Sequence, residues 1–169
     1  MADLNIEEIS EFITSDKFLD GLCPSFGEGF GGMFQTRWDF VDALGIGLQS
    51  HLCISLKESL DRPSISALYR GHPIYRLDIV PDHVEKPNPP WASKFGLPNY
   101  VSGCHTHPWE QNKDFVEKNW DKSLPAREPL QESMSTLEHA LAQVTDDLNI
   151  SITGEQRVVS LPPQGRFLG

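Results

Sequence analysis

The histidine pair, His105 and His107, lies in the segment Gly103-Cys104-His105-Thr106-His107-Pro108 and is the clearest chemical signal of this chain. Side chains alternate across a strand, so both imidazoles point to the same side where the backbone is extended. We predict a strand over residues 100–104 that leads into the pair. Because Pro108 cannot donate to an internal sheet ladder, the pair is expected at a strand exit, where functional residues often lie.

Arg76 and Asp78 are the expected partners of the pair, because they share one face of a second predicted strand, residues 74–80. If the two strands are neighbours, the Asp78 carboxylate and both imidazoles belong to one site. His83 follows shortly after this strand and is an alternative partner. The predicted metal ligands are His105, His107 and Asp78. The predicted catalytic residues are Arg76, Asp78 and His83.

Three kinds of chemistry suit these residue types. In the first, the histidine pair and a carboxylate hold Zn²⁺ or another divalent ion, and the metal lowers the pKa of a bound water. In the second no metal is present: one histidine is a general base, another a general acid, and Arg76 stabilises a developing anion. In the third no reaction occurs, and the cluster recognises a ligand or supports the proline-rich segment 81–98.

Composition indicates one cytoplasmic domain spanning residues 1–169. The three cysteines are widely spaced and lack a CxxC pair, and no apolar run is long enough for a membrane span. The net charge is −10, from 24 acidic and 14 basic residues. Residues 61–108 are the exception, with 4 acidic and 5 basic side chains. An acidic exterior disfavours nonspecific nucleic-acid binding, so nucleic acid is expected only as a possible substrate.

The elements that must position the site predict an α+β fold. A short amphipathic helix is expected over residues 6–15, behind Asn5 as its cap. Strands are expected over 33–40, 48–56, 64–70 and 74–80, and a closing hairpin over 150–152 and 157–161. Apolar residues at alternating spacings of four and three predict a long helix over 129–148. The predicted architecture is a mostly antiparallel sheet covered by this long C-terminal helix.

The segment 101–108 resembles the HxHP signature of the JAMM/MPN zinc isopeptidases. In that family both histidines ligate zinc, a downstream aspartate is the third ligand and an upstream glutamate activates water. The resemblance implies that His105 and His107 are zinc ligands. The family's Ser-x-x-Asp does not follow, because the first serine after Pro108 is Ser123 and neither Asp114 nor Asp121 lies at the usual interval.

A longer resemblance covers about half of the chain. The pattern Arg76-Leu77-Asp78, His83, Asn88-Pro89 and Gly103/His105/His107, followed by a C-terminal helix, resembles a group of small uncharacterised bacterial and phage proteins. Many members look like parts of toxin–antitoxin or phage–host conflict loci. The resemblance implies an intracellular conflict role, with an antitoxin or a defence complex as a possible protein partner.

Two hypotheses for function follow. The first is a His-centred hydrolase-type protein, metal-assisted, that acts on a phosphodiester or nucleotide whose anionic group contacts Arg76. The second is a non-catalytic acidic protein that binds and masks a nucleic-acid-binding partner, as suggested by the net charge of −10.

Overall fold

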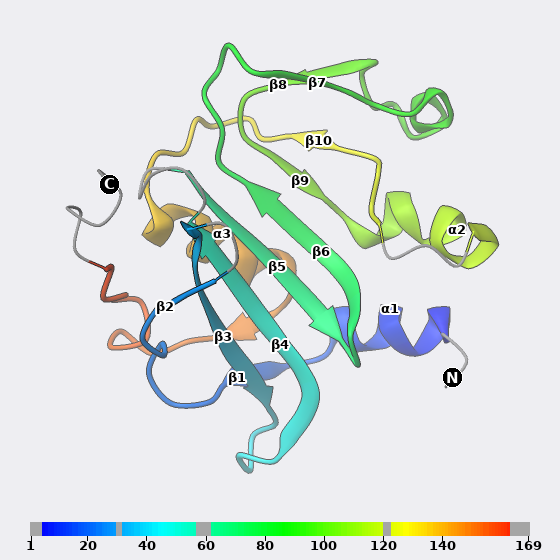
Figure 1. Cartoon of the computed structure of the whole chain (residues 1–169). Helices are drawn as coiled ribbons and strands as arrows, with labels where there is room; N and C mark the ends of the chain where they lie inside the picture. The colour runs from blue at the N-terminus through cyan, green and yellow to red at the C-terminus, as the bar shows by residue number, and fades with distance from the viewer. Residues whose placement is uncertain (1–4, 30–31, 57–61, 120–122, 163–169) are drawn as a thin grey trace.

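A single large sheet dominates the structure, a computed structural model that describes residues 5–29, 32–56, 62–119 and 123–162 (Figure 1). Nine strands of this described part form the sheet in the order β10-β9-β6-β5-β4-β3-β1-β11, and β2 pairs with β3. β1 and β11 are parallel, and the other recorded pairs are antiparallel. The strands are β1 (Lys17–Leu19), β2 (Gly27–Glu28), β3 (Phe34–Val41), β4 (Gly47–Leu56), β5 (Pro63–Tyr69), β6 (His72–Asp78), β9 (His105–His107), β10 (Glu128–Pro129) and β11 (Ile150–Ser151).

The two faces of the sheet differ in character because side chains alternate along each strand. In β3, every second residue from Phe34 to Phe40 is buried, including Trp38, whereas the residues between them are exposed. The inward-facing residues of β4, β5 and β6 join this core. The opposite face carries mostly polar side chains, including Arg76 and Asp78 of β6. The sheet therefore has one covered face and one face on which a site can be built.

Two helices pack against the covered face. α1 (Ile6–Thr14) begins where the Asn5 side chain accepts a hydrogen bond from the Glu8 N–H at 3.1 Å. α3 (Leu137–Asp147) begins where the Thr136 hydroxyl accepts from the His139 N–H at 3.2 Å, and it lies behind the sheet in Figure 1. The short N-terminal helix predicted over residues 6–15 is confirmed.

The predicted fold with a long C-terminal helix covering the sheet is wrong. The structure is mainly a large mixed sheet with short helices, and α3 has 11 residues where a helix over 129–148 was expected. Pro129 instead belongs to β10, which pairs with β9. Leu130 and Met134 still pack against the core from a non-helical segment, which explains why their spacing resembled a helix.

The ends of several predicted strands also differ from the structure. The expected strands over 33–40, 48–56, 64–70 and 74–80 correspond to β3, β4, β5 and β6. The expected strand over 100–104 stops early, because β8 (Tyr100–Ser102) ends before Gly103 and the histidine pair forms the separate strand β9. The closing hairpin is also wrong, since β11 pairs in parallel with β1 and residues 157–161 form no strand.

A second small layer lies beside the β9–β10 end of the sheet (Figure 1). It contains the two-stranded sheet of β7 (Glu85–Pro87) and β8, the 3-10 helix η2 (Pro90–Phe95) and the helix α2 (Trp109–Asn119). Trp91 of η2 stacks on Phe115 of α2 at 5.5 Å between ring centroids. Among the described helices, none combines the length and apolar character that crossing a bilayer requires.

Lys17 links the ends of α1 and α3 inside the core. Its side chain is fully buried, and its ammonium group donates to the carbonyls of Ile13, at 3.0 Å, and Ser15, at 2.7 Å, as well as to that of Leu148. These carbonyls belong to helix ends, where the backbone lacks intrahelical partners. One buried cation therefore satisfies the C-terminal ends of both helices.

Candidate metal centre

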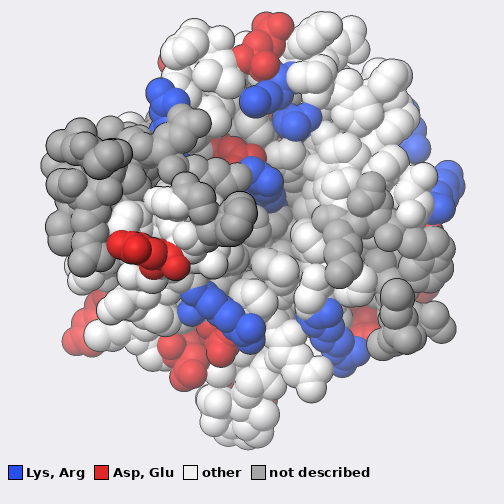
Figure 2. All heavy atoms as spheres, in the orientation of Figure 1, with Lys and Arg blue, Asp and Glu red and all other residues white. Residues whose placement is uncertain are grey.

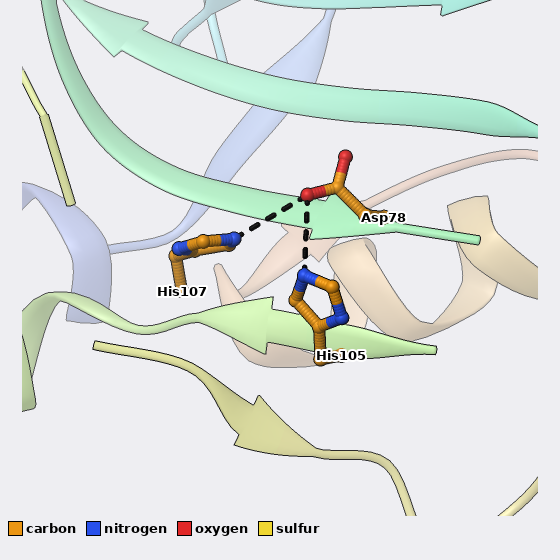
Figure 3. Close-up of side chains that lie close together, drawn as sticks. All are labelled: Asp78, His105 and His107. Carbon is orange, nitrogen blue, oxygen red and sulfur yellow. Dashed lines mark ion pairs between the residues drawn. The ribbon is translucent and has the colours of Figure 1, made fainter. Parts of the chain in front are cut away.

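The pairing of β6 with β9 brings the predicted site residues together. Their antiparallel register sets Asp78 opposite His105 and Arg76 opposite His107. Because residues i and i+2 share a face, all four side chains lie on the same side of the sheet. Figure 3 shows both imidazoles directed from β9 toward one carboxylate oxygen of Asp78 on β6.

Each imidazole is oriented by a main-chain carbonyl. His105 Nδ1 lies 2.9 Å from the carbonyl oxygen of Gly103, and His107 Nδ1 makes the same kind of contact with Leu124. A carbonyl can only accept, so each Nδ1 carries the proton and donates it. In a neutral imidazole this leaves Nε2 with a lone pair. Ligating histidines in metal proteins typically have this arrangement, with the second ring nitrogen donating to a carbonyl or carboxylate.

Gly103 makes the first of these contacts possible. Its φ of +77° lies in the left-handed region, which glycine adopts readily. A side chain here would also place Cβ at 3.0 Å from Asp82 Oδ1. The turn at Gly103 separates β8 from β9 and directs its carbonyl toward the His105 ring.

The distances to Asp78 match the spacing of ligands around a small cation. His105 Nε2 lies 3.4 Å and His107 Nε2 lies 3.3 Å from Asp78 Oδ2. Ligands held at about 2.1 Å in a tetrahedron are separated by about 3.4 Å, which follows from zinc–nitrogen and zinc–oxygen bond lengths. Charge-assisted N–H···O bonds are shorter, about 2.7–2.9 Å. The separation therefore fits shared coordination better than direct hydrogen bonds.

The electrostatics favour an ionised carboxylate facing a neutral imidazole. Burial alone raises the pKa of Asp78, but the neighbouring Arg76 guanidinium lowers it through its charge and its hydrogen bond, and that pKa lies well below its usual range. Burial lowers the pKa of His107, even though Asp78 and the Leu124 carbonyl act in the other direction. A lone pair on Nε2 then faces an anion, which is unfavourable unless a cation lies between them.

The Asp78, His105 and His107 side chains form a buried group that can hold a metal ion. Their candidate ligand atoms lie within 4.8 Å of one another. His105 and His107 are 2% and 6% exposed, so water competes weakly for the imidazoles. Structural zinc sites use four protein ligands, whereas catalytic ones use three and keep a position for water. The three ligands in the described part of the chain match the catalytic type.

Two cavities meet at this cluster. The smaller, about 410 Å³, is lined by all three candidate ligands together with Arg76, Lys86 and Arg127. The larger, about 740 Å³, is bordered by Arg76, Arg127 and His107 at the shared side. Figure 2 shows basic side chains around a recess in the upper half of this face. A ligand bound here meets the candidate metal position and several cations together.

Arg127 is a site residue that the sequence did not indicate. It precedes β10, and its backbone is held by Asn88, whose Oδ1 accepts from the Arg127 N–H at 2.7 Å and whose Nδ2 donates to the Arg127 carbonyl at 2.9 Å. The buried Asn112 on α2 holds Ala126 in the same two-sided way. These contacts join segments far apart in sequence, and no local pattern reports them. The Asn88-Pro89 dipeptide was the one nearby signal.

The structure separates the remaining predicted residues. Arg76 contacts Asp78 through Nε at 2.9 Å from Oδ2, so it lies in the site as expected. His83 is exposed in the turn after β6 and does not belong to the group of converging ligand atoms. Asp114, the first aspartate after the HxHP-like segment, is exposed on α2. Asp121 lies outside the described residues.

No protein-family model, curated protein or solved structure matches this chain. Both resemblances seen in the sequence therefore stay predictions. The carboxylate in the cluster, Asp78, precedes the histidine pair, whereas the third ligand of the JAMM/MPN signature follows it.

Proposed function

We propose that this protein is a metal-dependent hydrolase whose Asp78, His105 and His107 hold one divalent ion, and that its substrate is a phosphodiester or nucleotide. The observation that carries the proposal is the set of Nε2–Oδ2 separations, 3.3 and 3.4 Å, between imidazoles whose Nδ1 atoms are already committed to carbonyls. This arrangement leaves three electron-pair donors facing one point.

Zinc suits these donors best. Two imidazole nitrogens and one carboxylate oxygen are ordinary zinc ligands, whereas magnesium and calcium favour sets made entirely of oxygen. Cys104, the nearest cysteine in sequence, is directed elsewhere, because its thiol contacts the carbonyls of Val80 and Met134. The described cluster therefore offers a nitrogen and oxygen set without sulfur.

The reaction is divided among the residues of the cluster. A divalent ion supplies Lewis acidity and lowers the pKa of a bound water. The carbonyls of Gly103 and Leu124 fix the two rings, so that both Nε2 atoms stay directed at one point. Arg76 Nε lies 3.0 Å from Asp78 Oδ1 and 2.9 Å from Oδ2, which orients the carboxylate. The guanidinium also presents positive charge to the cavity, where an anionic substrate group gains stabilisation.

The charges around the smaller cavity support an anionic substrate. Arg76, Lys86 and Arg127 line it together with the candidate ligands. A chain of net charge −10 that gathers cations at its buried histidine pair is suited to admit an anion at that place. Phosphate esters combine the required charge with a bond that metal-assisted water can cleave.

Metal uptake and phosphodiester cleavage test this proposal together. The purified protein is depleted with a chelator, titrated with Zn²⁺ and assayed with bis(p-nitrophenyl) phosphate. We expect one zinc per chain and zinc-dependent release of p-nitrophenol. Both are lost in His105→Ala/His107→Ala and in Asp78→Ala. His139→Ala, an exposed histidine on α3, is the matched control and retains both.

Two outcomes would overturn the proposal. Stoichiometric zinc binding that persists in the double histidine variant would place the metal elsewhere. Cleavage that is unaffected by chelation but lost in the variants would instead support metal-free acid–base chemistry by the histidines. His83→Ala is a second control, because His83 is exposed outside the cluster and its loss is expected to leave zinc affinity unchanged.

A further inference from the structure

Arg127 has an enclosed nitrogen without a partner beside the candidate metal centre. Its terminal NH1 nitrogen donates to the carbonyl of Pro87 at 2.7 Å, which anchors the guanidinium. Its Nε is buried and has no hydrogen-bond partner among the described residues. A buried donor without an acceptor is unfavourable. An oxyanion bound in the adjoining cavities would remove this penalty.

Arg76 presents a second guanidinium to the same space. Its recorded contacts run through Nε to Asp78, and none of the described residues accepts from its two terminal nitrogens. Arg76 and Arg127 line both cavities. Burial lowers the pKa of Arg127, and the nearby Asp78 carboxylate raises it. The charge of Arg76 also lowers it, so the two guanidinium groups lie close enough to repel each other. Two neighbouring guanidinium groups with unused donors match the geometry of a phosphate.

The larger cavity adjoins these arginines and is mostly apolar. Its volume of about 740 Å³ lies within the usual range for pockets that hold small organic molecules, roughly 300–1,000 Å³. Its walls include the flat or branched apolar side chains of Leu68, Pro73, Pro89, Leu124 and Pro125, together with the hydroxyl groups of Ser66 and Ser123. An inorganic phosphate would leave most of this cavity unfilled. A planar base with a sugar offers apolar faces and polar edges to the same walls.

We infer that Arg76 and Arg127 form a phosphate-binding site for a nucleoside phosphate, with the nucleoside in the larger cavity and the phosphate beside the His107 ring. The inference rests on the proposed function for the reaction that follows. Binding itself is a property of the two arginines and needs no metal. Because His107 also lines both cavities, a ligand held in this way presents its phosphorus to the candidate metal position.

Calorimetric titration of chelator-treated protein with adenosine 5′-monophosphate tests this site directly. We expect one binding site, with affinity about tenfold or more weaker in Arg127→Gln, since a charged hydrogen-bond donor pair is lost. Arg127→Lys keeps the charge but not the paired donors, and we expect an intermediate affinity. Arg37→Gln is the matched control. Arg37 is an exposed arginine paired with Asp39 at 2.8 Å, it lies outside both cavities, and its loss leaves affinity unchanged.

Two further ligands test separately the phosphate-binding arginines and the nucleoside-binding cavity. Inorganic phosphate tests the arginine pair alone, and adenosine tests the larger cavity alone. We expect each to bind at least about tenfold more weakly than the monophosphate, because each gives up one set of contacts. Equal affinities for phosphate and the monophosphate would overturn the assignment of the nucleoside to the cavity. Wild-type affinity in Arg127→Gln would overturn the role of Arg127.

Zinc content keeps this inference separate from the proposed function. Chelator-treated wild type is expected to bind the monophosphate without zinc, and Arg127→Gln is expected to keep one zinc per chain while its monophosphate affinity falls. If zinc binds as proposed and the wild type does not bind the monophosphate, the phosphate site alone is refuted. Thermal unfolding of Arg127→Gln checks its fold, which we expect to persist because Asn88 contacts only the backbone of residue 127.

Discussion

Replacement of Asn88 tests whether one side chain positions the segment that carries Arg127. Asn88 Nδ2 donates to the carbonyls of Pro98, at 2.8 Å, and Arg127, at 2.9 Å, and its Oδ1 accepts from the Arg127 N–H at 2.7 Å. Asn88→Ala removes all three bonds. At a net value of about 1 kcal/mol for each hydrogen bond, and with Asn88 only half-buried, we expect a loss of about 2 kcal/mol in the free energy of unfolding.

Amide hydrogen exchange at residue 127 gives the most specific measurement, and urea unfolding gives the global one. In Asn88→Ala we expect the Arg127 amide to exchange at least about tenfold faster, since 1.4 kcal/mol corresponds to a factor of ten. Asn88→Asp retains the acceptor for this amide but loses both donors, so it is expected to keep most of the protection of the Arg127 amide while losing stability. Asn119→Ala, which removes one exposed helix contact to Phe115, is the control.

Unchanged protection of the Arg127 amide in Asn88→Ala would refute this reasoning. It would mean that the Asn112 contacts to Ala126 hold the segment without help from Asn88. The monophosphate affinity of Asn88→Ala then shows whether the position of the Arg127 side chain depends on the hydrogen bonds from Asn88. We expect that affinity to fall together with amide protection.

Three further predictions concern stability, pH and local geometry. Burial lowers the pKa of Lys17 from 10.5 to about 8. Between these pH values the unfolded chain binds a proton that the folded one does not. In urea titrations, the free energy of unfolding of the wild type relative to Lys17→Met should therefore rise from about pH 8 to about pH 10.5, by at most about 3 kcal/mol. A difference between the two proteins that does not change with pH would contradict this. Gly103→Ala is expected to lower the free energy of unfolding by about 1–2 kcal/mol, because the backbone at residue 103 is left-handed, and to weaken zinc binding by displacing the His105 ring. Gly154→Ala is the control, since a Cβ there meets nothing within 4 Å. Tyr75→Phe removes the hydrogen bond that the Tyr75 hydroxyl donates to Asp147 at 2.6 Å, and should lower thermal stability without changing zinc stoichiometry. Altered stoichiometry would mean that α3 helps to shape the metal centre.

The shared orientation of Asp78 and the histidine pair, given neighbouring strands, was predictable because it depends on short-range rules. Residues i and i+2 share a face of a strand, and the two segments carry complementary residue types. The sequence did not specify that β6 and β9 are neighbours, since strand pairing depends on contacts across the whole chain. The prediction of a strand that leads directly into the pair failed at Gly103, where a φ of +77° ends one strand before the next begins.

The long C-terminal helix was mispredicted for a different physical reason. Apolar spacing reports which side chains face a core, and both a helix and an irregular segment can bury residues at such intervals. Leu130 and Met134 reach the core without helical backbone, and Thr136 then supplies the cap from which α3 begins. Arg127 was missed because its role depends on Asn88 and on cavities formed by distant segments.

X-ray absorption at the zinc edge of the reconstituted protein tests the central claim most directly. We predict a first shell of nitrogen and oxygen at about 2.0–2.1 Å with the multiple-scattering signature of two imidazoles, and its loss in His105→Ala/His107→Ala. A sulfur shell at about 2.3 Å, or zinc surrounded by water alone, would contradict coordination by Asp78, His105 and His107.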